Sequence, residues 1–277
     1  MEHEKIDLLL NPESVRKILT GFIRSEISRV GYTRAVVNLS GGLDSSLTCY
    51  LAVEALGAEN VLTLLLPYKS STSDSLEHSE MVINALGVQS LTIPITDMAD
   101  ALIGRFPDMS RVRQGNIMAR LRMIVLYDQS EVFHALPVGT GNKTEILLGY
   151  TTLYGDSASA INPLGDLYKT QVRQLARSIG VPAVIIDKPP TADLWVGQTD
   201  EGELGFTYEE VDQLLYLLVD QRYKPEDCIQ AGFSESFVST VIERIRRNQF
   251  KRLMPPIAKL SNRTVGYDFL YLRDWGT

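Results

Sequence analysis

The sequence has few residues of the kinds that carry zinc or thiol chemistry. Its two cysteines, Cys49 and Cys228, lie too far apart to form a CxxC pair, so two buried, reduced thiols are expected. Its three histidines form no HxxxH or HExxH pattern, which argues against a zinc site. We expect His3 to be disordered, His78 to be solvated at the polar start of a helix, and His134 to be a core residue within an apolar strand.

Long apolar runs and basic segments are missing as well. No stretch reaches about 18 apolar residues, the length that a membrane-spanning helix needs. The N-terminus begins acidic and has no basic segment before an apolar core, so no secretory signal is expected. These absences predict a cytoplasmic protein without a membrane partner.

Positive charge is also in deficit, because the net charge is −7 and the pI is about 5.1. Binding to nucleic acid depends on a basic face that neutralises phosphates, so nucleic acid is not expected as a partner. A small anionic ligand remains compatible with a few local cations. The 277 residues, 44% of them hydrophobic, can form one large α/β domain, and we expect residues 1–277 to be a single domain.

The apolar pattern alternates between strand-like and helix-like segments. Asn11 and Pro12 read as a cap and first turn of a helix that runs to about Val30. Short apolar runs predict strands at 35–39, 61–67, 90–95 and 131–141, with a further one at 183–187, and helical spacing predicts helices at 45–56, 74–86 and 111–130. This alternation predicts an α/β fold with a doubly wound, mostly parallel sheet flanked by helices, in a core of about 31–190. Residues 206–260 read as a helical C-terminal portion.

A glycine-containing loop follows the first predicted strand. Residues 40–46 read SGGLDSS, between that strand and a helix. Adjacent glycines let the backbone approach a ligand, and the serine hydroxyls and the helix N-terminus add donors for phosphate oxygens. Asp44 would be repelled by phosphate unless a divalent cation lay between them, so the aspartate itself predicts Mg²⁺.

A second glycine-containing turn, GTGNKT at 139–144, fits neither familiar nucleotide-binding motif. Asn142 separates Gly141 from Lys143, so the Gly-Lys-Thr ending of a Walker A loop is absent. Thr144 replaces the third glycine of a dinucleotide fingerprint. Both readings are therefore rejected.

Several blocks together resemble the NAD synthetase family, within the ATP pyrophosphatase group. They are SGGLDSS, GTGNKTE (139–145), TLYGD (152–156), LYKTQV (167–172), KPPTADLWVGQTDEGELG (188–205) and FKRLMPP (250–256). The resemblance covers about residues 12–260 and implies an adenine nucleotide α-hydrolase-like fold and a cytosolic homodimer. It implies amidation of deamido-NAD by ammonia with ATP and Mg²⁺, through an acyl-adenylate that releases AMP and pyrophosphate.

The resemblance also assigns roles to individual residues. Asp44 and Glu145 would hold the metal and, with Lys169, form the catalytic group. The ATP-binding residues would be Asn38, Leu39, Ser40, Gly41, Gly42, Leu43, Asp44, Ser45, Ser46, Thr140, Lys169 and Thr191. Deamido-NAD would be bound by Arg120 and Lys251, with Asn116 and Arg122 in the same block as Arg120.

Three positions depart from the pattern of some family members. Leu153, Ala160 and Phe250 stand where those members have Lys, Asp and His, all assigned to deamido-NAD. The departures indicate a subtype. Two other functions remain open: another adenylating ligase of the same group, such as a tRNA-modifying or GMP-forming enzyme, and a non-catalytic nucleotide-binding dimer.

Residues 189–205 have a composition typical of a functional loop. They contain two prolines and three glycines with little periodicity, and they include the apolar cluster Leu194, Trp195 and Val196. Because an acyl-adenylate hydrolyses readily, water must be excluded until ammonia arrives. We expect this segment to close over the reaction centre as a lid, with Thr191 at its base.

Overall fold

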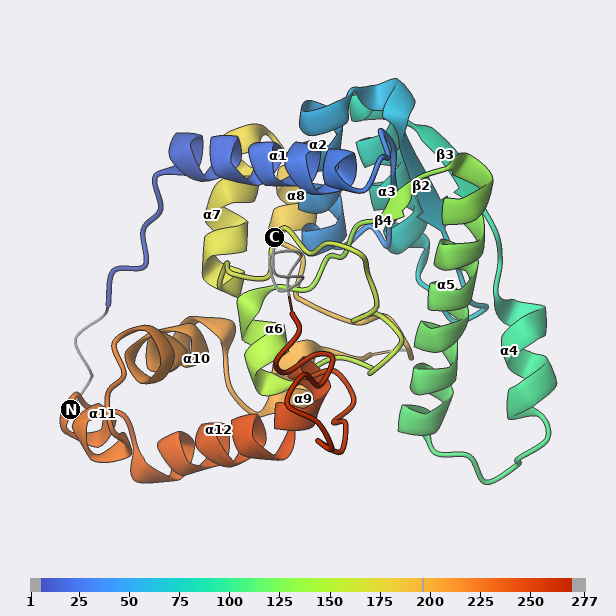
Figure 1. The fold of residues 1–277 in the computed structure, drawn as a ribbon. Helices are drawn as coiled ribbons and strands as arrows, with labels where there is room; N and C mark the ends of the chain where they lie inside the picture. The colour runs from blue at the N-terminus through green and yellow to red at the C-terminus, as the bar shows by residue number, and fades with distance from the viewer. Residues whose placement is uncertain (1–5, 196, 271–277) are drawn as a thin grey trace.

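The protein is built around a parallel sheet. The structure, a computed structural model, describes residues 6–195 and 197–270. Four strands in the order β3-β2-β1-β4 pair in parallel (Figure 1). They are β1 (Ala35–Asn38), β2 (Val61–Leu65), β3 (Gln89–Thr92) and β4 (Leu136–Pro137). The first three strands are added toward one edge of the sheet and β4 is added on the other side of β1, so the strand order reverses between β1 and β4. Open α/β sheets usually bind ligands at such a point.

Helices cover both faces of this sheet, which confirms the doubly wound fold. Ala35 and Val37 of β1 lie in an apolar cluster shared with α1, α2, α3 and α7, whereas Val36 lies in a cluster shared with α4 and α5. Successive residues of a strand point to opposite faces, so both faces of β1 are apolar. The helices are α1 (Pro12–Arg29), α2 (Leu43–Leu56), α3 (Ser73–Leu86), α4 (Thr96–Ile103), α5 (Arg111–Phe133) and α7 (Lys169–Ile179).

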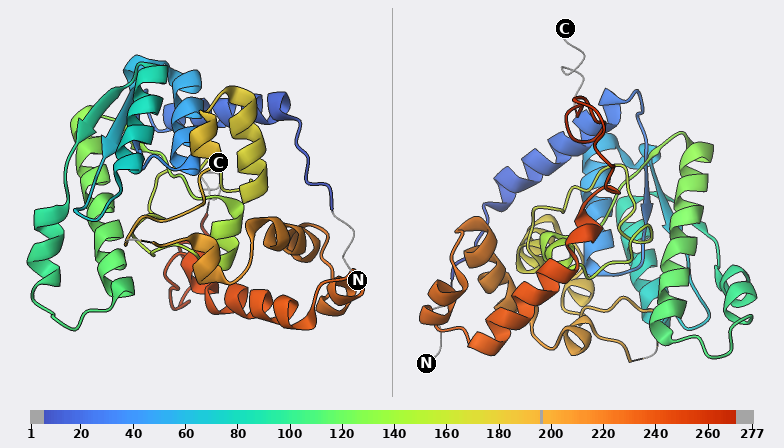
Figure 2. Two further views of the ribbon diagram at one scale, coloured as in Figure 1. Left: turned by 180° about the vertical axis from the view of Figure 1, so that it is seen from behind. Right: turned by 60° about the horizontal axis from the view of Figure 1, so that its bottom comes forward.

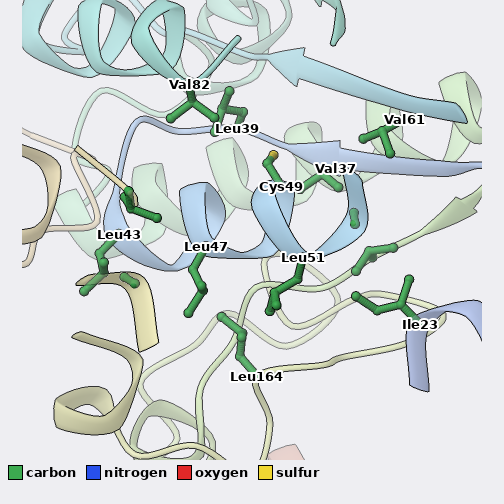
Figure 3. Close-up of a cluster of buried hydrophobic side chains, with 14 of the residues drawn as sticks. Ile23, Val37, Leu39, Leu43, Leu47, Cys49, Leu51, Val61, Val82 and Leu164 are labelled. Atoms are coloured by element: carbon green, nitrogen blue, oxygen red, sulfur yellow. The ribbon is translucent and has the colours of Figure 1, made fainter. Parts of the chain in front are cut away.

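Most side chains of helix α2 are buried, on more than one face of the helix. Figure 3 shows Cys49 directed toward Val37 and Leu39, while Leu47 points the other way, toward Leu164. All five side chains are buried. The helix that begins at the glycine loop is therefore packed into the core along most of its length.

The C-terminal helices form a second packed group, separate from the sheet in Figures 1 and 2. This group contains α10 (Tyr208–Leu215), a π-helical turn at Tyr216–Asp220, α11 (Pro225–Gln230) and α12 (Glu235–Arg247). Its apolar cluster also contains Leu148, at the end of α6 (Lys143–Leu148), and Leu204, at the end of α9 (Asp200–Leu204). Short helices also lie at Ala58–Asn60, Ala183–Ile186 (α8) and Gln249–Arg252.

Several predicted elements are confirmed and others are wrong. Asn11 caps α1 through the backbone N–H of Ser14, as expected. Residues 183–186 form helix α8 and no strand, because Pro182 occupies the cap position and the adjacent Ile185 and Ile186 are buried together, without the alternation of a strand. Residues 225–230 form a helix, within the predicted helical C-terminal portion.

Only Leu136 and Pro137 of the fourth predicted strand, 131–141, form a strand. Helix α5 continues to Phe133, and His134 ends it in the left-handed conformation with a φ of 50°. The His134 side chain is exposed, so the prediction of a core residue is wrong. His78 is buried and not solvated, because it shares the inward face of α3 with Ser75, Ser79 and Val82. His3 lies outside the described residues.

The expectation of two buried, reduced thiols is confirmed. Both cysteines are buried and free. Within the part of the chain that the structure describes, no helix has the length and apolar character needed to cross a membrane.

Candidate active site

A large cavity lies at the carboxyl ends of the strands. Its volume is about 520 Å³, and its lining includes Leu39 after β1, Leu66 after β2 and Thr140 after β4. Cavities of this size bind cofactors and small molecules. The cavity thus lies where the strand order reverses, between β1 and β4, as expected for an open α/β sheet.

The glycine loop forms one wall of the cavity. Gly41 has a φ of 74°, and a Cβ atom placed there would lie 2.1 Å from the backbone oxygen of Ser75. Only glycine fits this position. Gly42 is the cap residue of α2, so the N-terminal N–H groups of that helix begin at the loop.

The loop serines are organised around Gly42. The Ser45 and Ser46 hydroxyls donate to the Gly42 carbonyl at 3.1 and 2.8 Å, and the Ser40 and Ser45 hydroxyls are 3.0 Å apart. Of the loop residues assigned to ATP, seven line the cavity: Asn38, Leu39, Ser40, Gly42, Leu43, Asp44 and Ser45. Gly41 and the fully buried Ser46 do not line it.

Lys169 joins the two predicted metal carboxylates. Its Nζ lies 2.5 Å from Asp44 Oδ2 and 3.3 Å from Glu145 Oε1. Lys169 begins α7 and Glu145 lies in the first turn of α6, so three separate helix N-termini meet at this point. Residues that are far apart in the sequence are therefore in contact at the cavity wall.

Burial and mutual charge shift the pKa values of this group. Burial alone would lower the pKa of Lys169, but Asp44 and Glu145 raise it above its usual value. Burial raises the pKa of Glu145, against the opposing effect of Lys169. The ammonium is thus held in its charged form between the carboxylates.

The carboxylate pair fits a hard divalent cation. Within the described residues, no three His, Cys, Asp or Glu side chains converge as a metal site would require. Two carboxylates that already share one cationic group do fit Mg²⁺, which is usually held by one or two carboxylates together with phosphate oxygens and water.

Several polar residues under Lys169 escaped the sequence-based prediction. Asp200 accepts hydrogen bonds from the hydroxyls of Tyr150 and Tyr208, each at 3.2 Å, and the Tyr208 ring lies 5.3 Å from Lys169 Nζ. Burial raises the pKa of Asp200, while Lys169 lowers it.

Asp212 was also missed. It is fully buried and accepts from the Thr144 hydroxyl at 2.6 Å and from the Thr170 backbone N–H at 2.8 Å. The Thr144 hydroxyl in turn accepts from the backbone N–H of Lys169. A usable sign was present in the sequence, since Asp212 lies on the apolar face of α10 with Tyr208 and Leu215.

Three of the four residues predicted for deamido-NAD line the cavity: Asn116, Arg122 and Lys251. Arg120 does not, because it is exposed and donates to the Leu153 carbonyl.

The three lining residues are already engaged. Lys251 Nζ donates to the carbonyls of Gly149 and Thr151 at 2.6 and 2.8 Å. Arg122 Nε donates to the Leu66 carbonyl at 3.0 Å, and burial lowers its pKa. Asn116 Oδ1 accepts from the Thr152 hydroxyl at 2.8 Å.

The segment 189–205 crosses the cavity. Pro189 to Trp195, including Thr191, line it, and Leu194 contacts α5 at Gly115. Asp193 Oδ2 accepts from the backbone N–H of Thr72 at 3.2 Å and from the Ser75 hydroxyl at 3.0 Å. Leu194 and Trp195 are half-buried, whereas Val196 lies outside the described residues.

The sequence and the fold are similar to those of known proteins. A family model described as NAD synthase matches residues 15–255. An NH(3)-dependent NAD(+) synthetase from Trichlorobacter lovleyi is 54% identical over 269 residues, which cover 97% of this chain and 98% of that relative.

Two solved structures are similar over nearly the whole chain. NMN synthetase from Francisella tularensis has a TM-score of 0.79 and 30% identity, covering 92% of this chain and 100% of that one. An NH3-dependent NAD synthetase from Campylobacter jejuni, in complex with the nitrate ion, has a TM-score of 0.77 and 31% identity, covering 90% of this chain and 100% of that one.

Proposed function

This chain belongs to the NAD synthase family, and from that membership we infer that the cavity is the active site of an ammonia-dependent ligase. The enzyme amidates deamido-NAD to NAD and converts ATP to AMP and pyrophosphate. The observation that carries the assignment to this site is the contact of Lys169 with both Asp44 and Glu145, directly beside the glycine loop. We propose that residues 1–277 form one domain for this reaction.

The glycine loop binds the phosphates of ATP in this proposal. Backbone N–H groups at the start of α2 and the Ser40 and Ser45 hydroxyls are the donors, with Thr140 and Thr191 as further ATP contacts on the cavity wall. The nicotinate carboxylate attacks the α-phosphorus, pyrophosphate leaves, and an acyl-adenylate forms. Ammonia then attacks the acyl carbon, and AMP leaves with the carboxylate oxygen.

Asp44 and Glu145 are the proposed ligands of Mg²⁺. The bound ion would neutralise the charge of the departing pyrophosphate. Lys169, on the same carboxylates, supplies a fixed positive charge toward the phosphates. Catalysis then depends on positioning and electrostatics, and it needs no protein nucleophile. The scarcity of histidine agrees with this mechanism.

Deamido-NAD is proposed to bind at Asn116, Arg122 and Lys251, with Arg120 at the edge of the site. Arg120 already supports the backbone at Leu153, one of the three departing positions, so it can act there by holding the chain. Phe250, another departing position, is exposed and cannot replace a charged contact.

We also propose that the enzyme is a cytoplasmic homodimer and that 189–205 closes as a lid. Membership of a family of biosynthetic enzymes supports the first proposal. The lid proposal is supported by the position of Pro189 to Trp195 across the cavity and by the anchoring of Asp193 on α3.

A product assay tests the proposed function. The purified protein is incubated with ATP, Mg²⁺ and ammonium, and with deamido-NAD, nicotinate mononucleotide or xanthosine monophosphate as the acceptor. We expect NAD, AMP and pyrophosphate in equal amounts with deamido-NAD, and little product with the others. Equal turnover of the mononucleotide would overturn the dinucleotide assignment, and turnover of xanthosine monophosphate alone would overturn the family reaction. Replacing ammonium by ammonia-free glutamine should reduce the rate sharply.

A further inference from the structure

Asn142, the residue that breaks the Walker A pattern, is fully buried between the two carboxylates. Its side-chain Nδ2 donates to Asp44 Oδ1 at 2.9 Å, and its Oδ1 accepts from the Glu145 backbone N–H at 3.0 Å. The Asn142 backbone N–H donates to Glu145 Oε2 at 3.2 Å. One residue thus contacts both proposed metal ligands, which are 101 positions apart in the sequence (145 minus 44).

The four carboxylate oxygens are divided evenly between two partners. Asp44 uses Oδ1 for Asn142 and Oδ2 for Lys169. Glu145 uses Oε2 for Asn142 and Oε1 for Lys169. Asn142 therefore contacts one oxygen of each carboxylate, and the other oxygen of each contacts the Lys169 ammonium.

Helix capping explains only part of this arrangement. Asn142 and Glu145 form a reciprocal capping box at the start of α6. Serine and threonine also cap helices well, because a cap needs only a side-chain acceptor. The Nδ2 donor to Asp44 lies outside that role, since it crosses to another helix.

We propose that Asn142 is a positioning residue that fixes Asp44 and Glu145 for cation binding. The inference rests on the proposed function of the two carboxylates. Partners that orient metal ligands typically contribute about 10–100-fold to metal affinity or activity. Without the amide, the Asp44 carboxylate can rotate, because Lys169 then holds only one of its oxygens.

The test separates capping from positioning by substitution. Asn142→Ser and Asn142→Thr keep an acceptor for the α6 cap, but their hydroxyl is one bond shorter than the amide nitrogen and does not reach Asp44. The matched control is Asn11→Ser, which changes the asparagine cap of α1 in the same way without any carboxylate partner across the fold.

Two measurements are made on each variant. Mn²⁺ binding in the presence of ATP, followed by electron paramagnetic resonance, reports the metal site without turnover. Thermal unfolding reports the cap. We expect a Kd for Mn²⁺ about 10-fold or more above that of the wild type in both Asn142 variants, with unfolding temperatures close to those of the wild type and of Asn11→Ser. The KM for deamido-NAD should not change.

The outcomes distinguish a failure of the proposed function from a failure of the positioning role of Asn142. If the wild type binds no Mn²⁺ with ATP and forms no NAD, the proposed function itself fails. If the wild type does both and the Asn142 variants bind Mn²⁺ as it does, the positioning role is overturned. A loss of folding in both variants would overturn it as well, because Asn142 would then be a structural residue.

Discussion

The sheet region and the C-terminal helical group contribute to the cavity in different ways. The sheet region supplies the glycine loop, whose shape follows from backbone requirements such as the left-handed Gly41 against Ser75. The C-terminal group supplies Asp212 and Tyr208, which lie beneath Lys169 and Thr144. One region shapes the ligand site through its backbone, and the other supports it through buried polar side chains.

The difference between the two regions explains which site residues can be recognised from a sequence alone. A backbone requirement limits one position to glycine and leaves a short, local pattern. A buried carboxylate such as Asp212 depends on partners from α6 and α7, which only the fold brings together. The two kinds of contribution can be separated experimentally.

The strongest test removes the charges on the cavity wall. Asp44→Asn and Glu145→Gln should each lower kcat by about 10²–10³-fold, comparable to the loss of one preorganised catalytic group, with little change in thermal stability. Asp74→Asn, which removes an acid from the first turn of α3, is the matched control and should be neutral. Near-wild-type turnover of both active-site variants at saturating Mg²⁺ would remove their metal role.

The second test measures how stability depends on pH, which reports on Asp212 in the C-terminal group. Burial raises the pKa of Asp212 to about 6 from its usual 3.8, so the folded state binds the proton more tightly than the unfolded state. Its contribution to stability is therefore most favourable below about pH 4 and is lost as the pH rises through 6, by about 3 kcal/mol in total.

Asp212→Asn should lack this dependence. In urea unfolding at several pH values, the free energy of unfolding of the wild type should fall relative to that of the variant between pH 4 and 6.5. A constant difference across this range would mean that Asp212 does not titrate there. Thr63→Val, a buried threonine of β2 outside the cavity network, controls for general effects of core substitution.

A third test separates the two substrates. Lys251→Ala should raise the KM for deamido-NAD about 10-fold, as expected for losing one charge-assisted hydrogen bond, and leave the KM for ATP nearly unchanged. Arg120→Ala should raise the KM for deamido-NAD by a smaller factor, because Arg120 acts through the backbone at Leu153. Lys169→Ala should instead weaken ATP binding. Both substrates are titrated for each variant. An ATP defect in Arg120→Ala would refute the dinucleotide assignment of Arg120.

The smallest expected effect concerns the proposed lid. Hydrogen exchange across residues 189–205 should slow when ATP-Mg²⁺ and deamido-NAD are both added, because closure protects backbone N–H groups. Helix α11, in the C-terminal group and with no residue in the cavity lining, serves as the internal reference and should not respond. If the protection of 189–205 does not increase, this segment is a fixed wall and no lid.

The sequence predicted the sheet, the first helix and the glycine loop, because each depends on a local pattern of apolar spacing, capping or glycine. It misassigned 183–186 and 131–135, where short apolar runs have no distinguishing period. Asn142 illustrates the limit within the site. Its position after Gly141 excluded one motif, but its contact with Asp44 depends on the approach of two helices that no local pattern encodes.

Two of the three apolar clusters each contain one buried thiol outside any disulfide: Cys49 in the sheet region and Cys228 in the C-terminal group. Burial raises the pKa of both, so neither reacts readily while its own cluster is closed. The chain therefore carries two natural probes of local opening. Pulses of a thiol reagent, followed by peptide mass spectrometry, would time the opening of the two halves separately in the unmodified protein.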